Sequence, residues 1–362
     1  SKNMAIEKNK LGTRSITFRL TFGLLALVGI SLLLLAGALT YFSTRTSSEA
    51  LEQRLLDQLT SLEEVKRNET TAILESFVTA TRLMANSESF SRMIDGLRLA
   101  SDQVPANLAT SPAERLQALR KFYTEQYDAE FTSRNAGNPS GMLDRLDSLP
   151  ERAVALQYAY LARNPNRLGS KQLMQRSAVD RSPYAGLHEQ AHLSAKQWMD
   201  QYEFYDIFLV SLDGELVYSY FKEIDFGTNL ANGPFAQSGI GQAFAQARDA
   251  ADPNGVFLTG FAPYLPSYND QAAFLGAPVF VDGRRVGVLI SQIPIDQIQL
   301  VVNFRDNWDA AGLGLTGEAQ LVDRDGRHLI SSRRTANPAE YTAQLRRAGF
   351  PAEVTEAVQL RS

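Results

Sequence analysis

The 362-residue chain contains no cysteine, only three histidines and two tryptophans, and little net charge. The absence of cysteine excludes disulfides, thiol nucleophiles and cysteine-ligated metal sites. A formal net charge of −4 provides no basic surface of the kind that binds nucleic acid, so no nucleic-acid partner is expected. The sequence also lacks a phosphate-binding glycine loop, a nucleophile elbow and a Ser-His-Asp pattern, so we predict no cofactor and no catalytic residue.

Charge is completely absent from one long run near the N-terminus, residues 20–42. A helix of about 23 apolar residues is long enough to cross the ~30 Å hydrocarbon layer of a membrane. Basic residues dominate the segment before it, and they favour the cytoplasmic side. We therefore expect residues 1–19 to be cytoplasmic, 20–42 to form a transmembrane helix and the rest to lie outside. A cleavable signal peptide is the alternative, because Ala36-Gly37-Ala38 has the form of a cleavage site.

Proline is also absent from residues 43–100, which contain a single glycine. Apolar residues recur there at steps of three and four, mainly over 51–84, and this period is typical of a helix. We predict a long stalk helix over 43–100, a rod of roughly 75 Å for ~50 unbroken residues. Two shorter helices with a kink near Asn68 are the alternative. The apolar stripe over 51–65 is the expected seam of a homodimer.

Two further regions follow the stalk. Residues 101–203 are predicted to be helical, with helices over 113–131, 151–163 and 184–202. From Tyr205 the apolar period changes to two, which indicates strands. Five are expected, at 205–212, 215–221, 255–265, 271–281 and 284–294, with a loop and helix (222–250) after the second and a helix (295–304) after the last. Two paired strands, then a loop and helix, then three consecutive antiparallel strands are typical of a PAS-like sheet. The predicted fold class is therefore α+β.

Asp-Gly pairs at 213–214, 282–283 and 325–326 predict turns, since glycine tolerates positive φ and aspartate bonds its own backbone. The layout of strand, Asp-Gly turn and strand occurs again over 319–332. This weak internal repeat indicates the start of a second PAS-like module.

Three stretches together resemble a known family: LQYAYLARNPN at 156–166, GSKQL at 169–173 and YDIFLVSLDGELVYSYFKEIDFGTNLANGPF at 205–235. They are similar to the double Cache region, the PAS-like extracytoplasmic sensor of bacterial transmembrane receptors such as methyl-accepting chemotaxis proteins and class III nucleotide cyclases. The resemblance implies a membrane-distal module over 204–305 and a membrane-proximal one over 306–362, C-terminally truncated and incomplete. It also implies a second membrane helix, a HAMP linker and a cytoplasmic output domain that binds signalling partners.

The predicted function is therefore sensing of a small-molecule ligand by a receptor of the bacterial inner membrane. A chemotaxis transducer is the first expectation for the output, with a nucleotide cyclase or kinase as alternatives, and this fragment is not expected to be an enzyme. In a PAS-like fold the loop after the second strand borders the ligand cavity, and aromatic walls with few polar groups are typical of such sites. The candidate ligand-binding residues are Tyr205, Asp206, Tyr218, Lys222, Asp225, Phe235, Tyr264 and Asp270.

A literal H-E-x-x-H sequence lies at 188–192, and it supports a different hypothesis, a membrane-anchored zinc hydrolase. The metzincin continuation is missing, because Ala195 and Trp198 occupy the positions of its further glycine and histidine. We favour a pair of histidines that pack the helix against the sheet, and keep His188 and His192 as weak metal candidates. Amino-acid binding is not carried over from the Cache superfamily, whose Arg-x-Trp-Tyr element is replaced here by Lys196-Gln197-Trp198-Met199.

Overall fold

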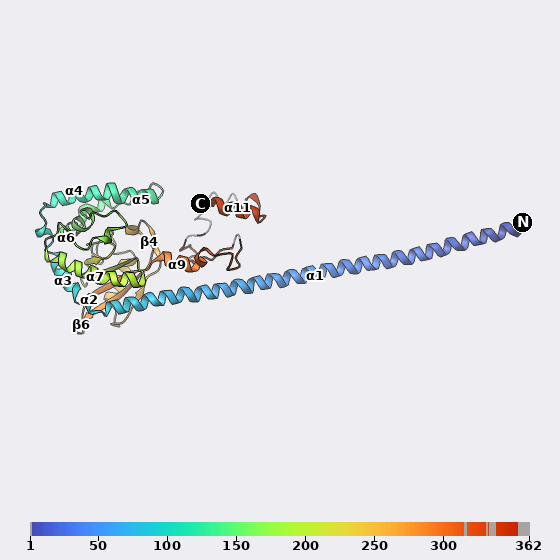
Figure 1. Cartoon of the computed structure of the whole chain (residues 1–362), viewed down its shortest axis with the longest axis horizontal. Coiled ribbons are helices and arrows are strands. Elements are labelled where there is room, and N and C mark those ends of the chain that lie inside the picture. The colour runs from blue at the N-terminus through green and yellow to red at the C-terminus, as the bar shows by residue number, and fades with distance from the viewer. Residues whose placement is uncertain (1, 315–316, 331, 333–337, 354–362) are drawn as a thin grey trace. The chain divides into compact units, whose positions relative to one another are not determined.

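The computed structural model describes residues 2–314, 317–330, 332 and 338–353. The chain divides into two compact units, Ser1–Val65 and Lys66–Ser362. One α-helix, α1 (Lys2–Ala85), makes up the described part of the first unit and continues into the second (Figure 1). The structure is therefore α+β with a long N-terminal helix, as predicted.

The apolar run at 20–42 lies entirely within α1 and is exposed along its length, as Leu33 at 74% and Leu34 at 70% illustrate. By length and composition this helix can cross a membrane. Its few polar side chains bond to the helix backbone: Ser31 Oγ donates to the Leu27 carbonyl at 2.8 Å, and Thr40 Oγ1 to the Ala36 carbonyl at 2.8 Å. Such bonds satisfy hydroxyl groups in a lipid environment.

Helix α1 passes Asn68 without a break, so the kinked alternative is wrong. It ends at Ala85 instead of continuing to residue 100, and two short helices follow, α2 (Glu88–Ser91) and α3 (Met93–Ser101). The last turns of α1 belong to the core of the second unit, where Phe77 and Met84 are buried. The hydroxyl groups of Thr81 and Ser291, 2.5 Å apart, join this end of α1 to the sheet.

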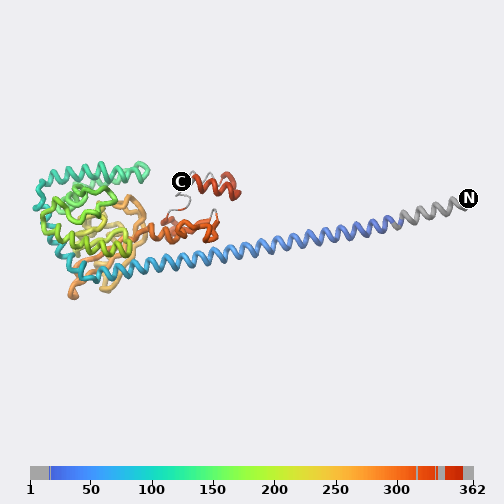
Figure 2. The backbone as a smooth tube through the Cα atoms, in the orientation of Figure 1, coloured from blue at the N-terminus to red at the C-terminus, as the bar shows by residue number. Residues whose placement is uncertain are grey.

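The helical region is close to its prediction, and Figure 2 traces it from teal to yellow-green. It contains η1 (Pro105–Asn107), α4 (Pro112–Phe122), the π-helical turn η2 (Tyr123–Tyr127), α5 (Asp128–Arg134), η3 (Leu143–Ser148), α6 (Glu151–Gln157), the π-helical turn η4 (Tyr158–Ala162), η5 (Lys171–Leu173) and α7 (Pro183–Tyr202). Ser111 begins α4 with a capping box, because its hydroxyl accepts from the Glu114 amide while Glu114 accepts from the Ser111 amide. This reciprocal pair satisfies two amides that a helix start otherwise leaves open.

An antiparallel sheet of five strands forms the centre of the second unit, in the order β2-β1-β7-β6-β3. Its strands are β1 (Asp206–Ser211), β2 (Leu216–Ser219), β3 (Phe257–Leu258), β6 (Phe274–Val281) and β7 (Arg284–Gln292). The predicted strand 255–265 is divided into β3 and β4 (Ala262–Tyr264), and the predicted strand 271–281 into β5 (Asp270–Ala272) and β6. Strands β4 and β5 pair with each other in a second sheet of two strands.

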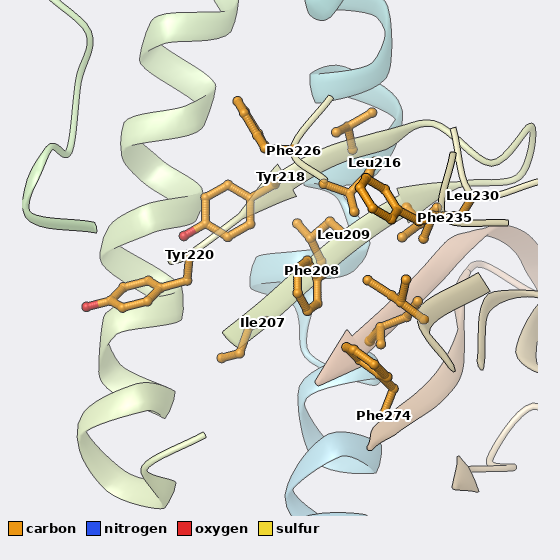
Figure 3. Packing of buried hydrophobic residues seen from close by; sticks show 14 of the residues in the cluster. Ile207, Phe208, Leu209, Leu216, Tyr218, Tyr220, Phe226, Leu230, Phe235 and Phe274 are labelled. Atoms are coloured by element: carbon orange, nitrogen blue, oxygen red, sulfur yellow. The ribbon is translucent and has the colours of Figure 1, made fainter. Parts of the chain in front are cut away.

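Helices cover both faces of the five-stranded sheet. Helix α8 (Gly239–Arg248) packs so closely on β6 that a Cβ atom added at Gly276 would lie 2.4 Å from the Ala243 carbonyl oxygen. On the other face, Ile94 of α3 lies against Gly287 of β7. Side chains alternate along each strand, and Figure 3 shows Tyr218 and Tyr220 pointing to the same side of β2 and its extension. That side faces α7.

The chain leaves the sheet through α9 (Ile295–Val302) and the turn η7 (Phe304–Asp306). In the predicted second hairpin, Val322 and His328 form one antiparallel bridge around the Asp325-Gly326 turn, and a helix, α11 (Pro338–Arg347), follows. Residues 315–316, 331, 333–337 and 354–362 of the predicted second module lie outside the described residues.

Candidate functional site

Four parts of the chain, η5, α7, the start of β1 and the loop after β2, meet at one end of the sheet, where β1 begins and β2 ends. They contribute six buried ionisable side chains, which we call the polar cluster: Lys171, His192, Asp206, Lys222, Glu223 and Asp225. Each is at most 9% exposed. Buried charges are costly unless they are paired or hydrogen-bonded. The hydrogen bonds of each side chain therefore indicate whether the protein itself satisfies it.

Asp206 organises the loop that follows β2. Its carboxylate accepts hydrogen bonds from the Ser219 hydroxyl at 2.8 Å and from the amides of Ile207, Tyr220 and Phe221 at 2.6, 2.9 and 2.9 Å. Burial, with the nearby Asp225 charge, raises the pKa of Asp206 to about 7 in spite of these donors. Both carboxylate oxygens of Asp206 accept hydrogen bonds from the protein itself, so this side chain holds the loop in position.

Lys222 is held in a strained conformation by that loop, with a φ of 64°. Such a backbone angle is uncommon for a residue with a side chain and is often found at functional sites. The buried amine donates to the Tyr220 carbonyl at 3.0 Å and lies 3.3 Å from His192 Nδ1. Burial lowers the pKa of Lys222 to about 7, while Asp206 opposes this effect.

The two acids after Lys222 are each bonded by hydroxyl groups. Glu223 accepts from the hydroxyls of Tyr205 at 2.8 Å and Ser267 at 2.7 Å, and Asp225 accepts from the Tyr264 hydroxyl at 2.5 Å. The other oxygen of Asp225, Oδ1, is buried and has no hydrogen-bond partner in the part of the chain that the structure describes. Burial raises the pKa of Glu223 to about 8 and that of Asp225 to about 6.

A short loop, residues 265–269, closes the site, and we call it the cover loop. Its Tyr268 ring stacks on Tyr127 with the ring centres 5.4 Å apart, and the Arg134 guanidinium lies 4.5 Å from the centre of the same ring. Asn135 Nδ2 donates to the Tyr268 carbonyl at 3.1 Å. These contacts link the cover loop to α5 and the π-helical turn before it.

A small cavity lies between the cover loop and the polar cluster. It is lined by Phe122, Tyr127, Leu168, Gly169, Lys171, Phe221, Lys222, Glu223, Ile224, Pro266 and Tyr268. Its volume of about 10 Å³ is close to what one water molecule requires. A larger molecule therefore fits only if some of the lining residues move.

Most of the candidate residues from the sequence gather here. Tyr205, Asp206, Lys222, Asp225 and Tyr264 belong to the hydrogen-bonded network described above. Tyr218 and Phe235 are buried beside it, Tyr218 against His192 and Phe235 against Tyr264. Asp270 does not belong to the cluster, because its side chain is 67% exposed and lies 3.9 Å from Arg134.

Sequence reasoning missed Lys171, Tyr127 and Ser267. Lys171 lies in the GSKQL stretch that contributes to the family resemblance, and this was the one available signal for it. Tyr127 and Ser267 reach the site through tertiary contacts alone. They come from a π-helical turn and from the cover loop, and neither position has a distinctive sequence pattern.

The H-E-x-x-H segment of α7 packs against the sheet. His192 Nε2 lies 2.7 Å from the Gln172 carbonyl, and its Nδ1 lies 2.9 Å from the Tyr218 hydroxyl. His188 Nδ1 lies 2.8 Å from the Gln175 carbonyl, and Glu189 pairs with Arg176 on the surface at 3.1 Å. The described residues contain no group of three side chains that could hold a metal ion. This geometry does not support the zinc-hydrolase hypothesis.

No protein-family model matches the chain, and no curated protein matches it. Among solved structures, the ligand-binding domain of the Pseudomonas aeruginosa PAO1 amino-acid chemoreceptor PctC, in complex with GABA, is similar to it at 16% identity and a TM-score of 0.26, covering 38% of this chain and 58% of that one. The ligand-binding domain of the Pseudomonas fluorescens chemoreceptor CtaA, in complex with L-isoleucine, is similar at 15% identity and a TM-score of 0.28, covering 42% and 58%. The sensor domain of the V. cholerae histidine kinase DctB is similar at 16% identity and a TM-score of 0.23, covering 51% and 59%.

This chain thus spans less than two thirds of the length of each of these proteins. At such identities and TM-scores, no residue role is transferred from them.

Proposed function

We propose that this chain is the extracytoplasmic ligand-sensing region of a bacterial inner-membrane receptor. The observation that carries the proposal is the polar cluster beneath the cover loop. Two lysines and three acids are buried there at the end of a small antiparallel sheet, and one of their oxygens, Asp225 Oδ1, has no hydrogen-bond partner among the described residues. Burying such groups costs stability, so their presence favours a binding role over a purely structural one.

In this proposal residues 1–19 lie in the cytoplasm, 20–42 cross the membrane, and 204–305 form a membrane-distal PAS-like module that receives the ligand. Residues 306–362 begin a membrane-proximal module, and the receptor works as a homodimer with cytoplasmic partners. A ligand beneath the cover loop shifts the population between two arrangements of the module, provided that it binds one of them better. Since the end of α1 is bonded to β7 through Thr81 and Ser291, a movement of the sheet reaches the helix that enters the membrane.

Ligand sensing is tested by thermal unfolding of the full chain in lipid nanodiscs with a panel of acidic, neutral and basic metabolites. We expect compounds of one chemical class to raise the unfolding temperature. Tyr268→Ala opens the cover loop, so it should weaken this effect and increase hydrogen exchange over 265–269. Tyr202→Ala is the matched control, because Tyr202 stacks on Trp198 at 5.7 Å elsewhere in the second unit. A panel without any effect on the wild-type chain would contradict the proposal.

The orientation is tested with single cysteines, which the natural chain lacks. Ser133→Cys places a thiol at an exposed position of α5, and Ser15→Cys places one before the apolar run. A membrane-impermeant maleimide should label the first variant in intact spheroplasts and the second only after lysis. The reverse pattern would place the sheet in the cytoplasm and overturn the proposed topology.

A further inference from the structure

A buried hydrogen bond joins the cover loop to the polar cluster, and its acceptor can ionise. Ser267 Oγ donates to Glu223 Oε2 at 2.7 Å, and Gln292 Nε2 donates to Ser267 Oγ at 3.3 Å. Ser267 is 2% exposed and Glu223 is 9% exposed. We call the bond between Ser267 and Glu223 the latch, because it connects the cover loop to the segment that follows β2.

The backbone of the cover loop has an uncommon conformation. Tyr268 and Asn269 have φ values of 58° and 65°, in the left-handed region that residues with side chains rarely adopt. The loop turns back on itself through two backbone bonds, from the Tyr268 amide to the Leu265 carbonyl at 3.0 Å and from the Asn269 amide to the Tyr264 carbonyl at 2.9 Å. Such a conformation persists only where surrounding contacts maintain it. The closed loop therefore depends on contacts such as the latch.

The carboxyl group of the latch is buried without a counter-charge. Both of its oxygens accept from neutral hydroxyl groups, those of Tyr205 and Ser267. Glu223 pairs with no cationic side chain in the part of the chain that the structure describes, although Lys171 and Lys222 line the same cavity. Because an unpaired buried charge is costly, the closed loop favours the neutral form of this acid. Burial accordingly raises the pKa of Glu223 to about 8.

The other titratable and charged groups nearby do not reverse this preference. The charges of Asp225 and Asp206 oppose the ionisation of Glu223. Burial lowers the pKa of Lys171 to about 8 and that of Lys222 to about 7, so both amines lose charge as the pH rises. The remaining groups around Glu223 and its neighbours are Tyr127 of η2, Arg134 of α5, His192 of α7, Tyr205 before β1, Tyr264 of β4 and Tyr268 of the cover loop. Burial raises the pKa of each of these tyrosines, which therefore stay neutral.

Movement of the loop changes the surroundings of this carboxyl. Glu223 lines the small cavity together with Pro266 and Tyr268 of the cover loop, so a displacement of the loop admits water to it. In water its pKa returns toward the ordinary value of about 4.3. The closed state then binds a proton over a pH range in which the open state does not. By linkage, a rise in pH from about 5 to about 8 favours opening.

We propose that the cover loop is a pH-controlled gate, closed while Glu223 is protonated and open when this acid loses its proton. A neutral carboxyl group can both donate and accept, so the latch remains possible in the closed, protonated state. Acid conditions then keep the cavity covered and alkaline conditions uncover it. The role of the gate in signalling rests on the proposed sensing function, whereas the movement of the loop can be measured without a ligand.

The test is hydrogen exchange of the full chain in lipid nanodiscs, without added metabolite, at several pH values. Protection factors are compared, because they remove the intrinsic dependence of exchange on pH. The bonded amides of Tyr268 and Asn269 report on the loop, and those of β7 are the internal reference. We expect protection in the loop to fall by at least about 10-fold between about pH 5.5 and about pH 7.5, and protection in β7 to fall much less. An equal fall in both would indicate loosening of the whole unit and would overturn the inference.

Two variants examine the role of the latch acid. Glu223→Gln keeps the shape of the side chain but cannot ionise, so loop protection should no longer depend on pH. Glu125→Gln, at an exposed position of η2, is the matched control and should behave as the wild type does. Tyr205→Phe removes a donor that favours the charged carboxylate, so the fall in protection should continue to higher pH. Tyr202→Phe is its control, because the Tyr202 ring stacks on Trp198 elsewhere in the second unit. A Glu223→Gln variant that keeps the pH dependence of the wild type would assign the effect to another group and contradict the gate.

The outcomes distinguish this inference from the proposed function. If metabolites bind while loop protection in the wild type is independent of pH, the gate is wrong and ligand sensing stands. If the loop opens with pH as expected while no metabolite binds, the gate stands and the small-molecule proposal fails. If neither occurs, both proposals fail.

Discussion

Lys222 Nζ lies 3.3 Å from Nδ1 of His192, so a buried amine from the loop after β2 meets an imidazole of α7. The other ring nitrogen, Nε2, is 2.7 Å from the Gln172 carbonyl, which can only accept. Nε2 must therefore carry the proton, and Nδ1 accepts from Lys222 and from the Tyr218 hydroxyl. Protonation of Nδ1 would place its N–H against the Lys222 ammonium, which can only donate.

This relationship predicts that His192 stays neutral in acid. Burial, followed by the Lys222 charge, lowers its pKa to about 3. Nitrogen-15 NMR of the imidazole should therefore show the Nε2–H tautomer from about pH 8 to about pH 5, where a histidine in an unfolded chain is mainly charged. A His192 signal that titrates near pH 6 would contradict the arrangement. Lys222→Met is the informative comparison, because it removes the neighbouring charge but leaves the Gln172 acceptor.

The close packing of α8 on the sheet gives a stability prediction. A Cβ atom at Gly276 would lie 2.4 Å from the Ala243 carbonyl oxygen, so Gly276→Ala must push the helix away from β6. We expect a loss of about 1–3 kcal/mol in the free energy of unfolding, measured with urea. Gly260→Ala is the matched control, because a Cβ atom there meets nothing within 4 Å. Equal stability of the two variants would mean that α8 does not pack here as described.

Local sequence patterns predicted the turns, α7 and the first two strands, because these features depend mainly on residues that are neighbours in the chain. The Asp-Gly pairs form turns, with Gly214 and Gly283 at φ of 90° and 77°, and α7 has nearly its expected bounds. The change of period at Tyr205 identified β1 and β2 correctly. The predicted end of the long helix was wrong, because the stripe of apolar residues continues through α3. The helix breaks at Asn86-Ser87, where Asn86 Nδ2 donates to Asn254 Oδ1 at 3.3 Å, a tertiary contact that no periodicity encodes.

The candidate site was only partly predictable for the same reason. Asp206, Lys222 and Asp225 lie next to strands that the pattern identified, so they could be named from the sequence. Lys171 lines the same small cavity as Lys222, which lies 51 positions further along the chain, and no periodicity encodes that arrangement. Asp270 lies outside the polar cluster, since the division of the expected strand into β5 and β6 leaves it exposed.

A further prediction concerns the hydroxyl of Tyr264, which lies 2.5 Å from Asp225 Oδ2 and helps to keep that buried acid charged. Tyr264→Phe removes this donor, so the pKa of Asp225 should rise further above about 6. We expect the variant to lose about 1.5–3 kcal/mol of stability at about pH 8, where the acid is charged, and less at about pH 5. Urea unfolding at both pH values measures the difference.

Tyr220→Phe is the control for that experiment. Tyr220 is buried to a similar extent and its ring stacks on His192, with the ring centres 4.6 Å apart, but its hydroxyl has no hydrogen bond within the described residues. Its removal should cost little at either pH. A Tyr264→Phe variant that loses the same stability at both pH values would show that the hydroxyl group does not act through the charge of Asp225.

The last prediction concerns Glu223 and the dependence of stability on pH. Burial, with the nearby Asp225 charge, raises the folded-state pKa of Glu223 to about 8, well above the ordinary value of about 4.3. Between these values the folded state binds more protons than the unfolded state. Stability from this group is therefore fully present below about pH 4 and is lost as pH rises through about 8. The loss should be on the order of 5 kcal/mol when the pH rises from below about 4 to above about 8.

Glu223→Gln keeps the shape of the side chain and an acceptor for the hydroxyls of Tyr205 and Ser267, but it cannot ionise. The stability of the wild-type chain should fall between about pH 5 and about pH 8.5 by more than that of the variant, as urea unfolding measures. Asp206 and Asp225 titrate in both proteins, so the difference reports the ionisation of Glu223 together with its coupling to these two acids. Glu125→Gln, on the exposed surface of the π-helical turn η2, should match the wild type. Parallel pH profiles for wild type and Glu223→Gln would show that Glu223 is already charged in the folded chain.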